Sequence, residues 1–94
     1  MANPNLERNE ESVVSLSRLS PGQSGRIVRV NGPAAARLRL LEMGLVRGET
    51  ISVERVAPLG DPVEFTIKGY HLSLRRQNTA NIYVVISTDG EVEP

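Results

Sequence analysis

One stretch of alternating residues constrains the fold more than any other, the segment VEFTIKGYHLSL at residues 63–74. If Lys68 and Gly69 form a two-residue turn, one face of the resulting hairpin is entirely apolar and the other is polar. The apolar pairs are Ile67 with Tyr70, Phe65 with Leu72 and Val63 with Leu74; the polar pairs are Thr66 with His71 and Glu64 with Ser73. Gly69 supplies the positive φ that such turns need. The sequence therefore predicts a β-hairpin whose apolar face, Tyr70 included, is buried.

The strand expected at residues 49–57 changes the phase of its apolar alternation after Val53. Pairing both halves of this strand with the first hairpin strand leaves Glu54 and Arg55 together opposite Glu64. Two residues opposite one is a β-bulge, and a bulge bends its strand. This bend indicates a curved sheet, as a small barrel requires.

Three further elements complete the expected fold. A strand is predicted at residues 25–30, a helix at 34–43 between Pro33 and a Gly44 cap, and a last strand at 81–86. The linker at 76–80 is expected to form a 3₁₀ turn. Together these elements predict an all-β domain with one short helix, in the form of a small, SH3-like, partly open five-stranded barrel. The domain is expected at residues 15–86, between a flexible tail at 1–14 and an acidic flexible tail at 87–94.

The predicted helix has two apolar stripes, whereas packing on a barrel needs only one. One stripe holds Ala36, Leu40 and Met43, and the other holds Ala34, Leu38, Leu41 and Leu45. Leu40 and Met43 are expected to pack on the barrel, so Leu38 and Leu41, flanked by Arg37, are the predicted partner interface. Leu59 in the loop APLGDP is a further expected contact, although the Pro and Gly residues there also suit a purely structural turn.

Charge is unevenly distributed along a chain whose formal net charge is zero. Residues 15–86 contain ten Lys or Arg and five Asp or Glu, a net charge of +5, while the two tails carry −2 and −3. A basic domain suits an acidic partner. The scarcity of aromatic residues argues against nucleic acid, because Phe65 and Tyr70 are expected inside the barrel and leave few stacking surfaces.

Catalytic and cofactor chemistry finds no support in the sequence. There is no cysteine, and the single histidine, His71, lies on the polar face of the hairpin without companion metal ligands. No phosphate-binding glycine loop and no nucleophile elbow is present. The sequence also has no apolar run of the roughly 20 residues that a membrane helix needs. We therefore expect a cytoplasmic protein that is not an enzyme, holds no metal or cofactor and does not insert into the membrane.

Three segments resemble one known family. RLLEMGLVRGETISV, RVAPLGDPVEF and KGYHLSLRRQNTANIYV occur in this order, and the likeness runs from about Leu16 to Val85. They are similar to the ferrous iron transport protein A family, FeoA. One departure is Arg47, where the family often has proline before the glycine.

The resemblance implies a small cytosolic SH3-like domain that supports the membrane ferrous-iron transporter FeoB, which has a cytosolic G-domain. The expected function is therefore accessory or regulatory, exerted by binding FeoB, with a homodimer as a further expectation. The alternative is an adaptor or regulatory module with a different protein partner, similar to the domain at the C-terminus of metal-dependent repressors.

Overall fold

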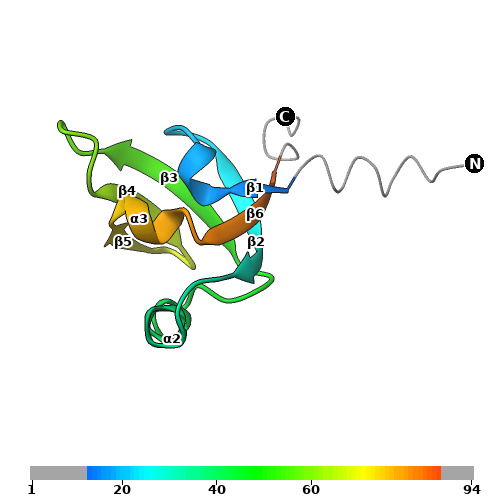
Figure 1. The fold of residues 1–94 in the computed structure, drawn as a ribbon. Helices are drawn as coiled ribbons and strands as arrows, with labels where there is room; N and C mark the ends of the chain where they lie inside the picture. Colours follow the sequence, from blue (N-terminus) through cyan, green and yellow to red (C-terminus); the bar gives the residue numbers. More distant parts are fainter. Residues whose placement is uncertain (1–12, 88–94) are drawn as a thin grey trace, which may run out of the picture.

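The computed structural model describes residues 13–87, which fold around one strongly curved antiparallel sheet (Figure 1). The sheet has six strands in the order β1-β6-β2-β3-β4-β5. Their bounds are β1 Val13–Ser15, β2 Ser24–Val30, β3 Thr50–Val56, β4 Val63–Ile67, β5 Tyr70–Leu74 and β6 Ile82–Ile86. Three helical segments connect them: η1 Leu16–Arg18, α2 Ala34–Glu42 and α3 Arg76–Thr79. β1 and β5 form the two edges of the sheet, so the barrel is partly open between them.

The hairpin register is confirmed at every position. β4 and β5 pair Ile67 with Tyr70, Thr66 with His71, Phe65 with Leu72, Glu64 with Ser73 and Val63 with Leu74. The bulge is also present, because the β3–β4 register shifts between Val53 and Arg55, and Arg55 lies opposite Glu64. The predicted class, all-β with one short helix, is therefore confirmed.

The predicted strand count of five is wrong, because the sheet contains a sixth strand at its edge. β1 pairs with β6, with Val13 opposite Val85 and Val14 opposite Val84. The sequence analysis placed Val13 and Val14 in the N-terminal tail, since three residues are too few to show a strand pattern. The remainder of both predicted tails, residues 1–12 and 88–94, lies outside the described residues.

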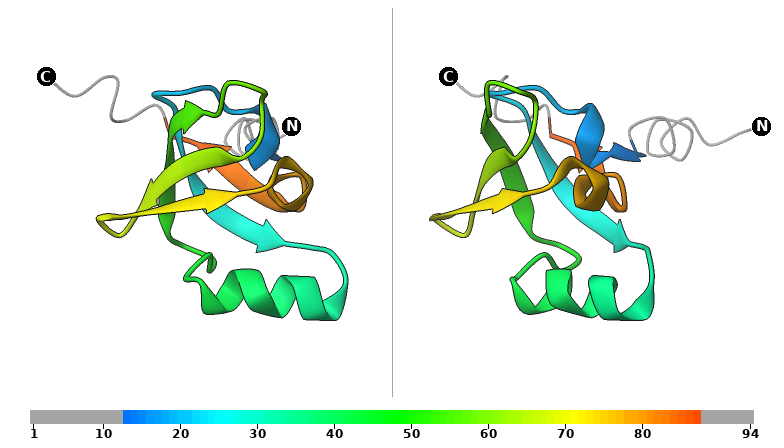
Figure 2. Two further views of the ribbon diagram at one scale, coloured as in Figure 1. Left: turned by 90° about the vertical axis from the view of Figure 1, so that its left-hand side faces the viewer. Right: turned by 60° about the vertical axis from the view of Figure 1, so that its left-hand side comes forward.

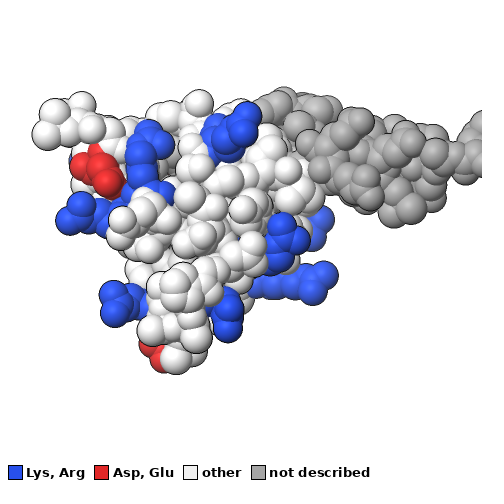
Figure 3. Space-filling view, in the orientation of Figure 1, with Lys and Arg blue, Asp and Glu red and all other residues white. Residues whose placement is uncertain are grey.

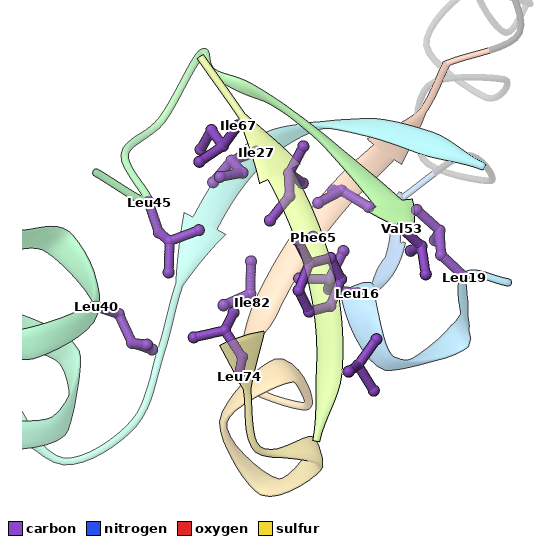
Figure 4. Packing of buried hydrophobic residues seen from close by; sticks show 13 residues of the cluster. Leu16, Leu19, Ile27, Leu40, Leu45, Val53, Phe65, Ile67, Leu74 and Ile82 are labelled. Atoms are coloured by element: carbon purple, nitrogen blue, oxygen red, sulfur yellow. The ribbon is translucent and has the colours of Figure 1, made fainter. Parts of the chain in front are cut away.

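The core fills the inside of the curved sheet (Figure 4). Phe65 on β4 lies near its middle, beside Leu16 of η1 and Val53 of β3. Leu40 of α2 and Leu45 after it reach the same cluster from the left side of the view in Figure 4, where α2 lies. The linker after β5 forms a four-residue α-helix, α3, instead of the predicted 3₁₀ turn, with Thr79 and Ala80 N–H groups bonded to Arg75 and Arg76 carbonyls.

Candidate functional site

Helix α2 lies below the barrel in both views of Figure 2. The contacts described next join its C-terminal end to the barrel. The N-cap of α2 is Pro33. At the other end the Gly44 N–H donates to the Leu41 carbonyl over 3.0 Å, and the Leu45 N–H donates to the Leu40 carbonyl over 3.1 Å. These two bonds define a Schellman motif. They turn the chain so that Leu40 and Leu45 are both buried.

Tyr70 of the hairpin holds the same end of α2. Its hydroxyl donates a hydrogen bond of 2.9 Å to the Met43 carbonyl. The prediction that Tyr70 is buried is wrong: its exposed fraction is 44%, because the ring extends outward from the barrel to the helix. A Cβ added to Gly44 would lie 2.5 Å from the Tyr70 hydroxyl oxygen, so this contact requires glycine there. The sequence analysis missed this role, although a tyrosine hydroxyl usually has a hydrogen-bond partner.

The outward surface of α2 carries the apolar side chains that the sequence analysis singled out. Leu38 is 56% exposed and Leu41 is 36% exposed, in agreement with the orientation predicted for them. Arg37 lies beside them, exposed, and its Nη1 is 3.3 Å from the Gly32 carbonyl oxygen. Leu45, which was assigned to the outward stripe, is buried because Gly44, at φ 100°, reverses the chain before it. We refer to Arg37, Leu38 and Leu41 as the α2 surface; its role as an interface stays a prediction.

Leu59 lies at the tip of the loop between β3 and β4, with 96% of its surface exposed. In Figures 1 and 2 this loop is at the top of the molecule, whereas α2 is at the bottom. The four residues predicted to contact a partner therefore do not form one patch. The structure provides two separate apolar surfaces, and a partner that touched both would have to extend around the barrel.

Residues 13–87 contain ten Lys or Arg and five Asp or Glu, and positive side chains predominate on the face shown in Figure 3. Among residues 13–87, ion pairs join Arg55 to Glu64 at 3.0 Å and Lys68 to Glu49 at 3.4 Å. The guanidinium of Arg29 lies 4.8 Å from the centre of the Tyr83 ring, on the outer face of the sheet. Within the same part of the chain the two cations of α2, Arg37 and Arg39, form no ion pair. Because α2 holds two arginines and one acidic residue, Glu42, the α2 surface has a margin of net positive charge.

His71 is exposed on the outer face of the hairpin, as predicted. Its Nδ1 is 3.2 Å from the Thr66 hydroxyl, which donates a 2.5 Å hydrogen bond to Glu54. Thr66 itself is half-buried, although we expected the polar face of the hairpin to be exposed. His71 also borders an open concavity of about 260 Å³ with Glu64, Leu72 and Ser73. Among the described residues, no three His, Cys, Asp or Glu side chains are grouped so that they could hold a metal ion.

The helices of the described region are all too short or too polar to span a bilayer. The two longer ones comprise nine residues in α2 and four in α3. The described structure therefore has two exposed apolar surfaces, the α2 surface and Leu59, on a basic domain.

Comparison with known proteins identifies relatives that share this domain. Residues 14–86 match the FeoA domain family. A protein of Porphyromonas gingivalis described as a fusion of Fe(2+) transport protein A and the Fe(2+) transporter FeoB is 48% identical over 80 residues. The matched part is 84% of this chain but 10% of the fusion protein, so this chain spans about a tenth of that curated relative.

Solved structures agree in fold. The solution structure of FeoA from Chlorobium tepidum is 38% identical, with a TM-score of 0.73, over 81% of this chain and 73% of that one. The crystal structure of Stenotrophomonas maltophilia FeoA with zinc, described as a prokaryotic SH3 domain protein, is 25% identical, with a TM-score of 0.63, over 78% and 88% of the two chains. The SH3-like character expected from the sequence is thereby confirmed. With nearly all of its described residues inside the family match, the chain belongs to the FeoA domain family, which is linked to ferrous iron transport.

Proposed function

We propose that this chain is a cytoplasmic, non-enzymatic accessory protein of ferrous iron uptake that binds the transporter FeoB through the cytosolic G-domain. The observation that carries this proposal is the fusion protein of Porphyromonas gingivalis, in which a domain 48% identical to this chain belongs to the same polypeptide as FeoB. Domains joined in one polypeptide remain at high effective concentration, so a separate chain that acts with the same partner needs a docking surface of its own.

The α2 surface is the best candidate for that docking. Leu38 and Leu41 are exposed on a helix whose opposite side, through Leu40, is fixed in the core. An apolar centre with a charged margin is the usual anatomy of a protein interface. Because Arg37 and Arg39 supply a positive margin, the matching surface of FeoB should be apolar with carboxylates around it.

The test is binding to full-length FeoB from the same organism, purified in detergent, with and without changes in the α2 surface. We expect the double variant Leu38→Ser/Leu41→Ser to remain folded, with a somewhat lower melting temperature because Leu41 is only 36% exposed, and to bind FeoB about 10- to 100-fold more weakly. The matched control is Thr50→Ser/Gln77→Ser, which changes two exposed residues outside α2 without altering net charge; it should bind within about threefold of wild type. Undiminished binding by the leucine variant would place the interface elsewhere.

Cross-linking distinguishes the finer parts of the proposal. The chain has no cysteine, so Leu38→Cys gives a single attachment point for a cross-linker. Cross-links to the G-domain are expected; cross-links confined to other parts of FeoB would refute that location. Sedimentation velocity tests the homodimer: if the leucine variant converts a dimer to a monomer while FeoB binding persists, the α2 surface is a self-association surface instead.

A further inference from the structure

The loop at residues 57–62 presents apolar side chains directly to solvent at the end of the barrel opposite α2. Leu59 is 96% exposed, and Pro58 beside it is also exposed. A single exposed leucine is ordinary on a protein surface. What distinguishes this one is the way in which the loop beneath it is held.

Two layers of hydrogen bonds fix the loop. Within it, the Gly60 N–H donates to the Ala57 carbonyl over 2.8 Å, and the Ala57 N–H donates to the Pro62 carbonyl over 3.0 Å. From outside it, Arg76 of α3 makes two contacts: its backbone N–H donates to Asp61 Oδ1 over 3.0 Å, and its Nε donates to the Gly60 carbonyl over 2.5 Å. The prolines on either side restrict the backbone further. Leu59 is therefore displayed on a preorganised support, and preorganisation lowers the conformational entropy lost on binding.

The charges around the tip are unequal. The carboxylate of Glu64 is paired with Arg55, and that of Asp61 accepts the Arg76 backbone N–H. Arg76 is exposed and forms no ion pair with a carboxylate of residues 13–87. The Arg76 guanidinium lies at the base of the tip, where its Nε donates to the Gly60 carbonyl. An apolar tip beside this cation is complementary to an apolar cavity with a carboxylate at its rim.

A second copy of this chain is a poor occupant for the tip. The other exposed apolar surface is at the opposite end of the domain, so a contact from Leu59 to α2 of a second copy would be head-to-tail. Such contacts form open chains of molecules unless the rotation between copies closes a ring. A different protein with an apolar cavity can accommodate Leu59 without forming open chains of molecules.

We propose that Leu59 is an anchor that inserts into an apolar, carboxylate-rimmed cavity of the transporter, at a place separate from the one that receives the α2 surface. This inference rests on the proposed function, since it takes FeoB as the partner. The domain then docks at two points, and each contact needs only modest strength because the first raises the effective concentration of the second.

The experiment pairs affinity with a local probe at position 59. Full-length FeoB in detergent is titrated against wild type, Leu59→Ser and Leu59→Met. We expect Leu59→Ser to bind about 10- to 100-fold more weakly, the range for withdrawing one buried leucine side chain, and Leu59→Met to bind within about threefold of wild type. Both variants should melt like wild type because the side chain contacts solvent and not the core.

Because the chain contains no cysteine, a bimane fluorophore can be attached to Leu59→Cys, to Leu38→Cys and to Thr50→Cys, an exposed control on β3. On addition of FeoB, a blue shift at positions 59 and 38 but not at 50 is the expected result. A shift at 38 alone, with Leu59→Ser binding like wild type, would overturn the second anchor and leave the proposed function intact. Absence of any binding to FeoB would overturn both. A shift at 59 that follows the concentration of this chain without FeoB would show self-association and refute the inference.

Discussion

Replacing Gly44 by alanine tests how α2 is fixed to the barrel, because two independent penalties meet at this residue. The backbone of Gly44 has φ 100°, a region that residues with a Cβ rarely adopt. An alanine in a left-handed conformation costs about 1–2 kcal/mol. In addition, the new Cβ would lie 2.5 Å from the Tyr70 hydroxyl, so the ring must move and its 2.9 Å bond to the Met43 carbonyl is lost. A lost hydrogen bond of this kind costs about 0.5–1.5 kcal/mol.

The two penalties together predict that Gly44→Ala lowers the free energy of unfolding by about 2–3 kcal/mol. For a domain of this size each kcal/mol corresponds to roughly 4–8 °C, so the melting temperature should fall by about 10–20 °C. The assay is a double-mutant cycle with Tyr70→Phe, measured by urea denaturation followed by circular dichroism. In the Tyr70→Phe background, Gly44→Ala should lower the free energy of unfolding only by the cost of the left-handed backbone conformation.

The cycle therefore predicts a coupling of about 1 kcal/mol between the two substitutions, with the double variant more stable than the sum of the single effects implies. The reasoning fails if the single effects add to within about 0.3 kcal/mol, because Tyr70 and Gly44 would then not be in contact. It also fails if Gly44→Ala is as stable as wild type. Gly48→Ala is the matched control, since Gly48 has φ 97° and no atom within 4 Å of the added Cβ; it should show no coupling to Tyr70.

Two further substitutions test the packing of the sheet. Phe65→Ala empties the centre of the core and should lower the free energy of unfolding by about 3–5 kcal/mol, a large part of the total for a small domain; a melting temperature near wild type would show that Phe65 is not central. Gly25→Ala would place a Cβ 2.7 Å from Val84 Cγ2 and 2.8 Å from Val84 Cβ, and overpacking of this kind costs about 1–3 kcal/mol. Urea denaturation measures this loss, and a Gly25→Ala variant as stable as wild type would refute the close approach of β2 and β6.

Local patterns in the sequence were sufficient for the hairpin and for the outward side chains of α2. Period-two alternation on both sides of Lys68-Gly69 admits one register that keeps the faces separate, and helical periodicity separates Leu38 from Leu40. The errors lie where a residue is placed by something distant. β1 is a strand because its three residues pair with β6, and Tyr70 is exposed because its hydroxyl reaches the end of α2.

The arrangement of the candidate surfaces was less accessible from sequence than the surfaces themselves. Leu38, Leu41 and Leu59 could each be identified as exposed from their local context. Their separation depends on the curvature of the sheet and on where α2 hangs from it, which no local pattern encodes. The loop at 57–62 was equally ambiguous from its sequence, since its support by Arg76 joins residues on different elements.

The pairing of β1 with β6 has a consequence for how this domain can be attached to other polypeptides. Val13 lies opposite Val85, so the described chain enters and leaves the fold on neighbouring strands, on the side of the barrel away from α2 (Figure 1). A linker added before residue 13 or after residue 87 would therefore start from nearly the same place and would leave α2 unobstructed. Gene fusion in either order should thus yield the same presentation of the helix, and joining the two ends directly should permit circular permutation with new termini in the loop at 57–62.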